Sequence, residues 1–498
     1  MLVGVGQVTQ RPDGTRPLTE RAEPVELMTE ALRAAATDCG GGGAGDRLLA
    51  AARTLRIMAP LCWHYRNPGL LVAERLKIEV PELALTDIGG NNPQTVASAT
   101  ASAIARGDVD VALLAGADCI YTRVAVRRDP DRPVLPWTVQ DPATPEPLQL
   151  GNERKPVTAL EQQRGLDRPT RVYPLFENAI RAAAGETVDV HRAKTATLWS
   201  RFSEVAAGNP HAWSPWARTA AEIADVGPDN RMICFPYPKL MNANDRVDQG
   251  AALILCSVEA ARHAGVPEDR WVFPWAGADA HDHWYLSRRT DLCSSPALRL
   301  AGRHALTLAG MGIDDVAHLD LYSCFPSAVQ IAAEALGLSV DRDDRPLTVT
   351  GGLTFAGGPG NNYVSHSLAV MADVLRSDAG SVGVVTGMGW YATKHAVGLW
   401  STDPPRRGFA HANPQAEVDA MARRPESADI GGEGSIETYT VVHRPDGEPE
   451  RGIVAVLTPG RARLWGTVDD PGTLVALERE DGCGRSAHIA ADGSTALG

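Results

Sequence analysis

The same order of predicted elements occurs twice in this 498-residue chain, and this repeat constrains the possible fold more than any other sequence feature. The first copy begins with a strand that ends in a Gly pair, ELALTDIGG at 82–90. A helix of small residues follows at 93–106, with Pro93 suited to its first turn and Gly107 to its end. The run DVDVALLAGAD (108–118) then predicts a buried strand.

The second copy repeats this order near the end of the chain. LTVTGG (347–352) predicts a strand with a Gly pair, and a Gly/Asn loop leads into a helix over about 364–376. SVGVVTGMG (381–389) predicts another buried strand. Because both copies run strand, Gly loop, helix, strand, we predict an internally duplicated α/β fold.

Other segments add to this frame. We expect a helix at 24–38, a strand followed by a helix within 246–266, and a strand, tight loop and helix within 318–338. A Pro-rich insertion at about 120–240 carries further helices, and long insertions of this kind often cap an active site.

The composition changes after about residue 405. Short strands with turn signals between them run over 435–478, the last of them TLVALE at 473–478. This pattern predicts a small antiparallel β module, a barrel of OB type, followed by about twenty frayed residues.

Bulk properties narrow the function. The net charge of −13 argues against nucleic-acid binding, which needs a basic face. We expect no membrane span and no signal peptide, since no apolar run approaches 18 residues and MLVGVGQVTQ has no charged start. The eight cysteines are scattered without a CxxC pair, as in a cytoplasmic protein with reduced thiols.

Five segments together resemble the thiolase superfamily, nearest to its sterol-carrier-type members and to bacterial type-1 thiolase-like proteins with an extra C-terminal domain. These segments are GGNNPQTVASATASAIARGDVDVALLAGAD, NDRVDQGAALILCS, LDLYSCFPSAV, GGLTFAGGPG and VVTGMG. The resemblance covers about residues 1–405 and implies a duplicated αβαβα fold. The domains expected from it are an N-terminal half (1–265, insertion included), a C-terminal half (266–410), and a linker with the β module (411–498).

Thiolase chemistry needs a nucleophilic cysteine, an activating histidine and a second cysteine that moves the α-proton. The resemblance places Gly90 at the nucleophile, Gly358 at the histidine, and Val385 or Thr386 at the second cysteine. It places Tyr322 at a further histidine of the family. It therefore implies a protein of the acetyl-CoA acyltransferase family that binds acyl-CoA and has lost thiolysis.

The Gly loops have two interpretations. Glycines at helix starts let backbone amides face an oxyanion, and neighbouring asparagines add amide donors. The alternative is that the glycines only allow tight turns between packed elements. The candidate substrate-binding residues are Gly90, Asn91, Asn92, Gly357, Gly358, Asn361, Asn362, Gly387 and Gly389, together with Arg127 and Arg128 as contacts for coenzyme A phosphates.

Four residues are candidates for catalysis. Tyr322 matches a tyrosine of the thiolase-related steroid side-chain aldolases, and Tyr363 lies in the second Gly/Asn loop. Cys324 and His366 would form a nucleophile–base pair if their loops meet. The alternatives are tyrosines whose hydroxyls bond to backbone and a cysteine that acts as a small buried hydrophobe.

Two patterns are weaker. Asp279, His281 and His283 alternate as metal ligands on a strand would, but no further ligands cluster there, so we predict a polar loop and no metal. LCSS (292–295) imitates a thiolase nucleophile motif outside the expected helix, and we interpret it as a chance match.

Three functions stay open from the sequence. The first is an acyl-CoA-binding protein of lipid metabolism without thiolase activity. The second is a tyrosine-dependent aldolase or lyase acting on an acyl-CoA thioester. The third is a non-catalytic partner that docks through its C-terminal module. We expect a monomer or homodimer, and no cofactor apart from coenzyme A or its thioester as ligand.

Overall fold

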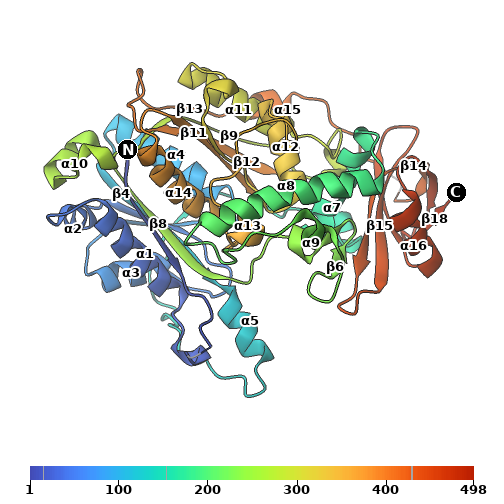
Figure 1. Ribbon diagram of the computed structural model, residues 1–498, viewed down its shortest axis with the longest axis horizontal. Coiled ribbons are helices and arrows are strands. Elements are labelled where there is room, and N and C mark those ends of the chain that lie inside the picture. Colours follow the sequence, from blue (N-terminus) through green and yellow to red (C-terminus); the bar gives the residue numbers. More distant parts are fainter. Residues whose placement is uncertain (15, 153, 428–429) are drawn as a thin grey trace.

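The computed structural model describes residues 1–14, 16–152, 154–427 and 430–498. Two mixed sheets form the body of the molecule (Figure 1). The first has the order β1-β8-β4-β2-β3-β5, and the second has the order β10-β11-β12-β9-β13. The strands of the first sheet are β1 (Leu2–Thr9), β2 (Thr54–Met58), β3 (Glu82–Thr86), β4 (Val111–Cys119), β5 (Leu148–Leu150) and β8 (Asp248–Cys256). Those of the second are β9 (Phe273–His281), β10 (His318–Asp320), β11 (Val382–Gly389), β12 (Lys394–Ser401) and β13 (Ala410–Ala412).

The two sheets confirm the duplication. In the first, β2 and β4 are parallel, while β4–β8 and β8–β1 are antiparallel. In the second, β10 and β11 are parallel, while β11–β12 and β12–β9 are antiparallel. The strands also follow one another along the chain in the same order, so each half is one copy of a single unit.

Two inner helices lie between the sheets. They are α4 (Asn92–Arg106), which packs on β9, β11 and β12, and α14 (Tyr363–Ser377), which packs on β1, β8 and β11. A Cβ atom at Gly277 of β9 would lie 2.6 Å from Ser98 Oγ, so the glycine lets α4 approach the sheet closely. Helices α1 (Pro24–Asp38), α3 (Pro68–Leu76), α11 (Pro296–Ala309) and α12 (Pro326–Leu336) belong to the two halves, and α2 (Ala44–Ala50) and α10 (Val258–Ala264) pack together beside the first sheet.

The insertion joins the body to the C-terminal module. It contains α5 (Ile120–Arg128), α6 (Ala159–Gln163), α7 (Pro169–Ala183), α8 (Val188–Gly208), α9 (Ala220–Ala224), β6 (Met232–Cys234) and β7 (Tyr237–Pro238). Cys234 of β6 pairs with Val442, which makes β6 a strand of the C-terminal sheet. The insertion and the module therefore share one sheet, and in Figure 1 α7 and α8 lie between the body and the module.

The C-terminal module is a mainly antiparallel sheet, as expected, but two details differ from the sequence prediction. Its elements are β14 (Gly432–His443), β15 (Pro449–Leu457), β16 (Arg463–Val468), α16 (Pro471–Glu480), β17 (Ser486–Ile489) and β18 (Thr495–Leu497). TLVALE is helical because Asp470 caps the helix, Pro471 occupies its first turn, and Leu474 and Leu477 are buried one turn apart. The final residues are not frayed, since β17 pairs with β14. An isolated bridge between Thr467 of β16 and Ser494, which precedes β18, also connects the two outermost strands of the sheet.

The predicted strand at 347–350 is also wrong. Thr348 Oγ1 donates a hydrogen bond to Asp320 Oδ1 at 2.8 Å, and the Val349 amide donates to the same oxygen at 2.9 Å. Because the buried Asp320 carboxylate takes these donors, the segment is a loop that leads into the short helix α13 (Gly352–Phe355).

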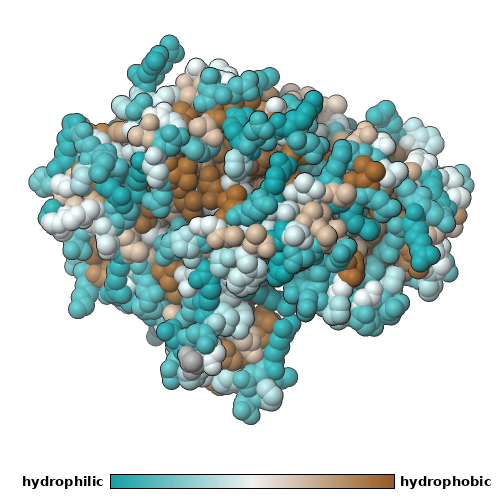
Figure 2. All heavy atoms as spheres, viewed as in Figure 1, coloured by the Kyte–Doolittle hydropathy of each residue, from teal (hydrophilic) through white to brown (hydrophobic). Residues whose placement is uncertain are grey.

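The surface seen in Figure 2 is largely hydrophilic, as is usual for a globular protein. Hydrophilic side chains dominate the rim of the molecule and most of the C-terminal module in the view of Figure 2. Within the described residues, no helix combines the length and apolar character needed to cross a membrane. The short helix α15 (Gln415–Asp419) follows β13 along the chain and packs on β9 and α11.

Candidate functional site

The same three residues, Gly-Asn-Asn, lead into both inner helices, at 90–92 for α4 and at 360–362 for α14. Asn361 joins the halves: its Oδ1 accepts from the Gly89 amide at 2.9 Å, and its Nδ2 donates to the Ala59 carbonyl at 2.7 Å. Asn362 Nδ2 donates to the Gly116 carbonyl at 2.6 Å. These amides thus hold the protein's own backbone, which the sequence alone did not reveal.

The glycines of the loop at 357–360 also face protein atoms. A Cβ atom at Gly357 would overlap Gln249 Oε1, and one at Gly360 would overlap Asp118 Oδ2. The Gly358 amide donates to the Asn244 carbonyl at 2.9 Å. Gly357 and Gly360 have φ values of 108° and 54°, which favour glycine. The described contacts of this loop are therefore the close packing of turns against neighbouring strands.

The first inner helix presents a different surface. A Cβ atom at Gly90 would overlap Tyr322 Oη and lie 2.6 Å from the Met388 carbonyl oxygen. Gly387 lies beside Asn91, where its missing side chain leaves room for the Asn91 Cα. The structure thus brings Gly90, Asn91, Tyr322 and Gly387 together at the N-terminal end of α4.

Tyr322 fills the space that a side chain at residue 90 would need. Its own amide donates to Thr386 Oγ1 at 2.8 Å, which fixes its backbone. Its ring meets that of Tyr363 edge to face, with 5.6 Å between centroids. The side chain is only 7% exposed, yet its hydroxyl makes no hydrogen bond within the described chain. Burial, together with Cys324 and Tyr363, raises the phenol pKa, so the hydroxyl stays protonated and can act as a donor.

Tyr363 has a structural environment. Its hydroxyl bonds to Thr350 Oγ1 at 2.6 Å and lies 3.4 Å from Asp320 Oδ2. Burial and the Asp320 carboxylate raise its pKa. The hydroxyl is thus satisfied by the same buried carboxylate that shapes the loop before α13.

Cys324 and His366 do not form a pair in the described structure. His366 Nδ1 bonds to Gln7 Oε1 at 2.8 Å, and its Nε2 is buried without a partner. Burial, with a smaller effect from His211, lowers the pKa of His366 to about 3. Burial raises the pKa of the Cys324 thiol to about 12, so Cys324 has little thiolate.

Sequence reasoning missed Lys394. Its Nζ lies 3.0 Å from Asp87 Oδ2 and 2.8 Å from the Ile88 carbonyl oxygen, so it ties the start of β12 to the loop before α4. The side chain is 13% exposed. Burial lowers the pKa of its ammonium, although Asp87 opposes this effect. A lysine at the start of a buried strand was the only signal for it in the sequence.

Asn91 carries an unsatisfied atom beside this lysine. Its Nδ2 donates to Thr95 Oγ1 at 3.1 Å, and Thr95 in turn donates to Asp279 Oδ1. Its Oδ1 is buried and has no hydrogen-bond partner among the described residues. A Cβ atom at Gly89 would lie 2.5 Å from this oxygen and 2.7 Å from Lys394 Nζ, and one at Gly389 would also overlap it. Gly89 and Gly389 therefore leave the space in which the amide and the lysine meet.

The hairpin between β11 and β12 is strained where it borders this site. Trp390 and Ala392 have φ values of 56° and 48°, a region that non-glycine residues rarely adopt. Tyr173 Oη donates to the Trp390 carbonyl at 2.9 Å and accepts from the Ala392 amide at 3.1 Å. Arg289 Nη1 donates to the Tyr391 carbonyl at 2.8 Å. These bonds hold the hairpin that carries Lys394.

The remaining candidates lie outside this group. Arg127 and Arg128 are exposed at the end of α5, which protrudes from the body (Figure 1). Asp279 bonds to Thr95 and His411, and His283 Nε2 bonds to the Ala422 carbonyl. Over the described ranges, no three His, Cys, Asp or Glu side chains are grouped as metal ligands.

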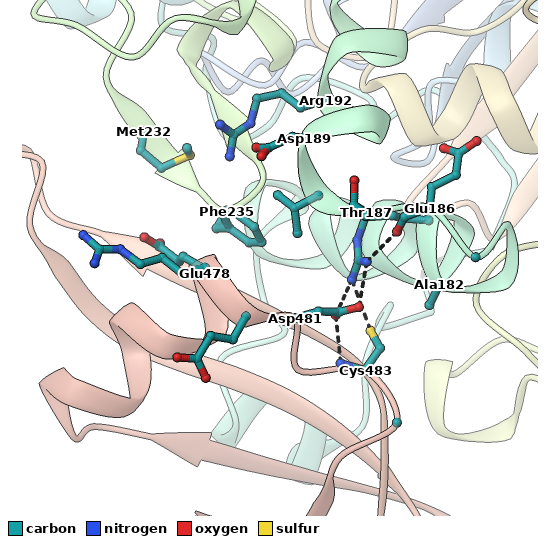
Figure 3. A pocket seen from close by; sticks show the side chains of 16 residues that line it. Ala182, Glu186, Thr187, Asp189, Arg192, Met232, Phe235, Glu478, Asp481 and Cys483 are labelled. Carbon is teal, nitrogen blue, oxygen red and sulfur yellow. Dashed lines mark hydrogen bonds and ion pairs between the residues drawn. The ribbon is translucent and has the colours of Figure 1, made fainter.

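A cavity of about 900 Å³ lies elsewhere, between the α7–α8 turn and the C-terminal module (Figure 3). Arg181 crosses it to Asp481, with Nη1 2.8 Å from Oδ2. Phe235 and Met232 form an apolar wall, while Arg192 and Glu478 add charges of both signs. None of the residues proposed from the sequence lines this cavity.

Comparisons with known proteins agree with the fold. Two family models match: the thiolase C-terminal domain-like model over residues 278–402 and the thiolase-like protein type 1 additional C-terminal domain over 414–494. No curated protein gave a match. Among solved structures, the Ltp2–ChsH2(DUF35) aldolase matches with a TM-score of 0.58, 18% identity, 80% of this chain and 97% of that chain. The dimeric peroxisomal thiolase of Saccharomyces cerevisiae matches with a TM-score of 0.57 and 12% identity, over 81% of this chain and 97% of that chain. At these identities, both show the fold alone.

A monomeric SCP2-thiolase-like protein type 1 from Mycobacterium smegmatis is much nearer. It is 34% identical, with a TM-score of 0.82, over 100% of this chain and 98% of that one. The match therefore includes both halves, the insertion and the C-terminal module. With this match over its whole length and the matching model of the additional C-terminal domain, the chain belongs to the type-1 SCP2-thiolase-like proteins.

Proposed function

We propose that the protein binds an acyl-CoA thioester at the N-terminal end of α4 and does not perform thiolysis. The observation that carries this proposal is the contact between Gly90 and Tyr322: a protonated, unpartnered hydroxyl stands where a nucleophilic side chain would be. Glycine cannot accept an acyl group, and the phenol is held in its neutral form by burial.

The surroundings favour a thioester as the ligand. The amides of Gly90 and Asn91 donate no hydrogen bond to other described residues, and they lie at the start of a 15-residue helix, where partial positive charge favours an oxygen with developing negative charge. The Tyr322 hydroxyl adds a side-chain donor. Together these groups would polarise a thioester carbonyl without attacking it.

Calorimetry with acetyl-, butyryl- and octanoyl-CoA tests binding. We expect saturable binding of at least one ligand, weakened in a Gly90→Val variant, which would place a branched side chain where the carbonyl is expected. Acetoacetyl-CoA and free coenzyme A should give no thiolysis above background. An absence of binding at millimolar concentration would contradict the proposal, and so would thiolysis that Cys324→Ala abolishes.

A second candidate is carbon–carbon bond cleavage by Tyr322, which the unpartnered hydroxyl favours. In a retro-aldol step the β-hydroxyl gives its proton to solvent water, the Cα–Cβ bond breaks to release Cβ as an aldehyde or ketone, and the electron pair of that bond forms the thioester enolate, which is then protonated at Cα. Tyr322 would supply that proton or the hydrogen bond to the enolate oxygen. Deuterium wash-in at Cα of a bound acyl-CoA tests it. Tyr322→Phe should abolish the exchange, whereas Tyr391→Phe, whose phenol interacts with Asp167 and Glu161, should leave it intact.

We also propose a monomeric, cytoplasmic protein. Strand β5 of the insertion pairs with β3 and covers the edge of the first sheet, and the relative from Mycobacterium smegmatis is described as monomeric. Light scattering at several concentrations tests the oligomeric state.

A further inference from the structure

We propose that Asn91 and Lys394 form a subsite that recognises a hydroxyl group on the acyl chain of the ligand. The inference rests on the proposed acyl-CoA binding and adds the substrate class. It follows from an unsatisfied acceptor and an available donor that meet beside Gly89.

The acceptor is oriented by its neighbours. Thr95 donates its hydrogen to Asp279, so its oxygen is left to accept from Asn91 Nδ2. This relay fixes which end of the Asn91 amide is oxygen, and turns Oδ1 away from Thr95, toward Gly89 and Gly389. Asn91 is 6% exposed, and a buried carbonyl oxygen without a hydrogen-bond partner destabilises the folded protein. A bound donor would remove this penalty.

The donor is Lys394. An ammonium group has three N–H donors, and two are directed to Asp87 Oδ2 and the Ile88 carbonyl. The third donates to no other residue of the described chain. Its Nζ and Asn91 Oδ1 both approach the same side of Gly89, which has no side chain to separate them.

A hydroxyl group suits this pair better than the amides of the coenzyme A arm do. One hydroxyl oxygen can donate to Asn91 and accept from Lys394 at a single point. The N–H and C=O of an amide point in opposite directions and cannot both face this pair. Asn91 directly follows Gly90, so the hydroxyl would lie close to the thioester carbon, and we choose a 3-hydroxyacyl-CoA as the probe.

The experiment compares two ligands that differ by one oxygen. Calorimetry should show that the protein binds one enantiomer of 3-hydroxybutyryl-CoA about tenfold more tightly than butyryl-CoA, as expected for a hydrogen-bonded hydroxyl. Asn91→Ala and Lys394→Met should each reduce that preference below about threefold, with butyryl-CoA binding little changed. The exposed residues Asn413 and Lys239 provide matched controls, and Asn413→Ala and Lys239→Met should keep the preference.

The outcomes separate this inference from the proposed function. Equal affinity for the two ligands in the wild type would overturn the hydroxyl subsite while acyl-CoA binding stands. If the wild-type protein binds neither 3-hydroxybutyryl-CoA nor butyryl-CoA, the proposed function is overturned. If Asn91→Ala does not fold, Thr95→Val tests the same point, because it frees the Asn91 amide to rotate and should lower the preference without removing either side chain of the pair. A preference that survives Thr95→Val and Lys394→Met would also overturn the inference.

Discussion

The hydroxyl oxygen of Tyr322 occupies the space that the first side-chain carbon of residue 90 would fill, because residue 90 is glycine. The two residues lie 232 positions apart and come from different halves of the duplicated fold. Their contact places a phenol hydroxyl, and no side chain of residue 90, at the N-terminal end of α4.

Adding a methyl group at Gly90 should destabilise the protein. Gly90→Ala would force Tyr322 or the Met388 carbonyl to shift, and overpacking of this kind costs about 1–3 kcal/mol in the free energy of unfolding. Gly208→Ala is the control, since nothing lies within 4 Å of its missing Cβ, and it should be neutral or stabilise by up to about 1 kcal/mol. Urea unfolding measures both, and equal values would show that Tyr322 moves aside freely.

The two tyrosines should respond differently to loss of their hydroxyls. Tyr322→Phe leaves no protein group without a partner, so we expect a change below about 0.5 kcal/mol in unfolding free energy. Tyr363→Phe removes bonds to Thr350 and the buried Asp320, and should cost about 1–3 kcal/mol. If Tyr322→Phe proves to be the more destabilising change in urea, its hydroxyl has a structural role.

Acid should destabilise the protein through His366. Its pKa falls from an ordinary 6.5 to about 3 on folding, so below pH 6.5 the unfolded state binds more protons than the folded state. The contribution of His366 to stability is complete above pH 6.5 and declines by up to about 1.4 kcal/mol per pH unit as the pH falls toward 3. His366→Gln should flatten this part of the stability curve from pH 4 to 7. A curve unchanged by the substitution would mean that His366 titrates normally.

The C-terminal module should be required for folding of the body. Truncation after residue 413 would remove the sheet that β6 joins and leave the Leu175 carbonyl and Asn178 Nδ2 without Thr438 and the Tyr439 carbonyl. We expect loss of cooperative thermal unfolding in circular dichroism. Removal of residues 495–498 alone, an edge strand, should leave a cooperative transition. A stable fragment 1–413 would show that the module is a dispensable addition.

Local patterns were enough to predict the frame of the molecule. The two Gly-Asn-Asn helix starts, the small-residue helix before Gly107 and the apolar strands each depend on neighbours within a few residues, and the structure has them where the sequence predicts them. The family resemblance placed Gly90 at the nucleophile position, and a glycine there has no side chain that could accept an acyl group in any conformation.

Contacts between distant segments decided the conformation of two mispredicted segments and the side chains that meet at the site. LTVT has the composition of a strand, but Asp320 takes its donors and makes it a loop. TLVALE follows an Asp–Pro pair that can begin either a turn or a helix. In the structure the Asp470 cap and the burial of Leu474 and Leu477 against the C-terminal sheet together favour the helix. Lys394 meets Asp87 across 307 residues, and Tyr322 meets Gly90 across 232. The sequence by itself determined that residue 90 has no side chain to act as a nucleophile. Only the packing of one half on the other decided which side chains surround residue 90, since such contacts depend on how the two sheets enclose the inner helices.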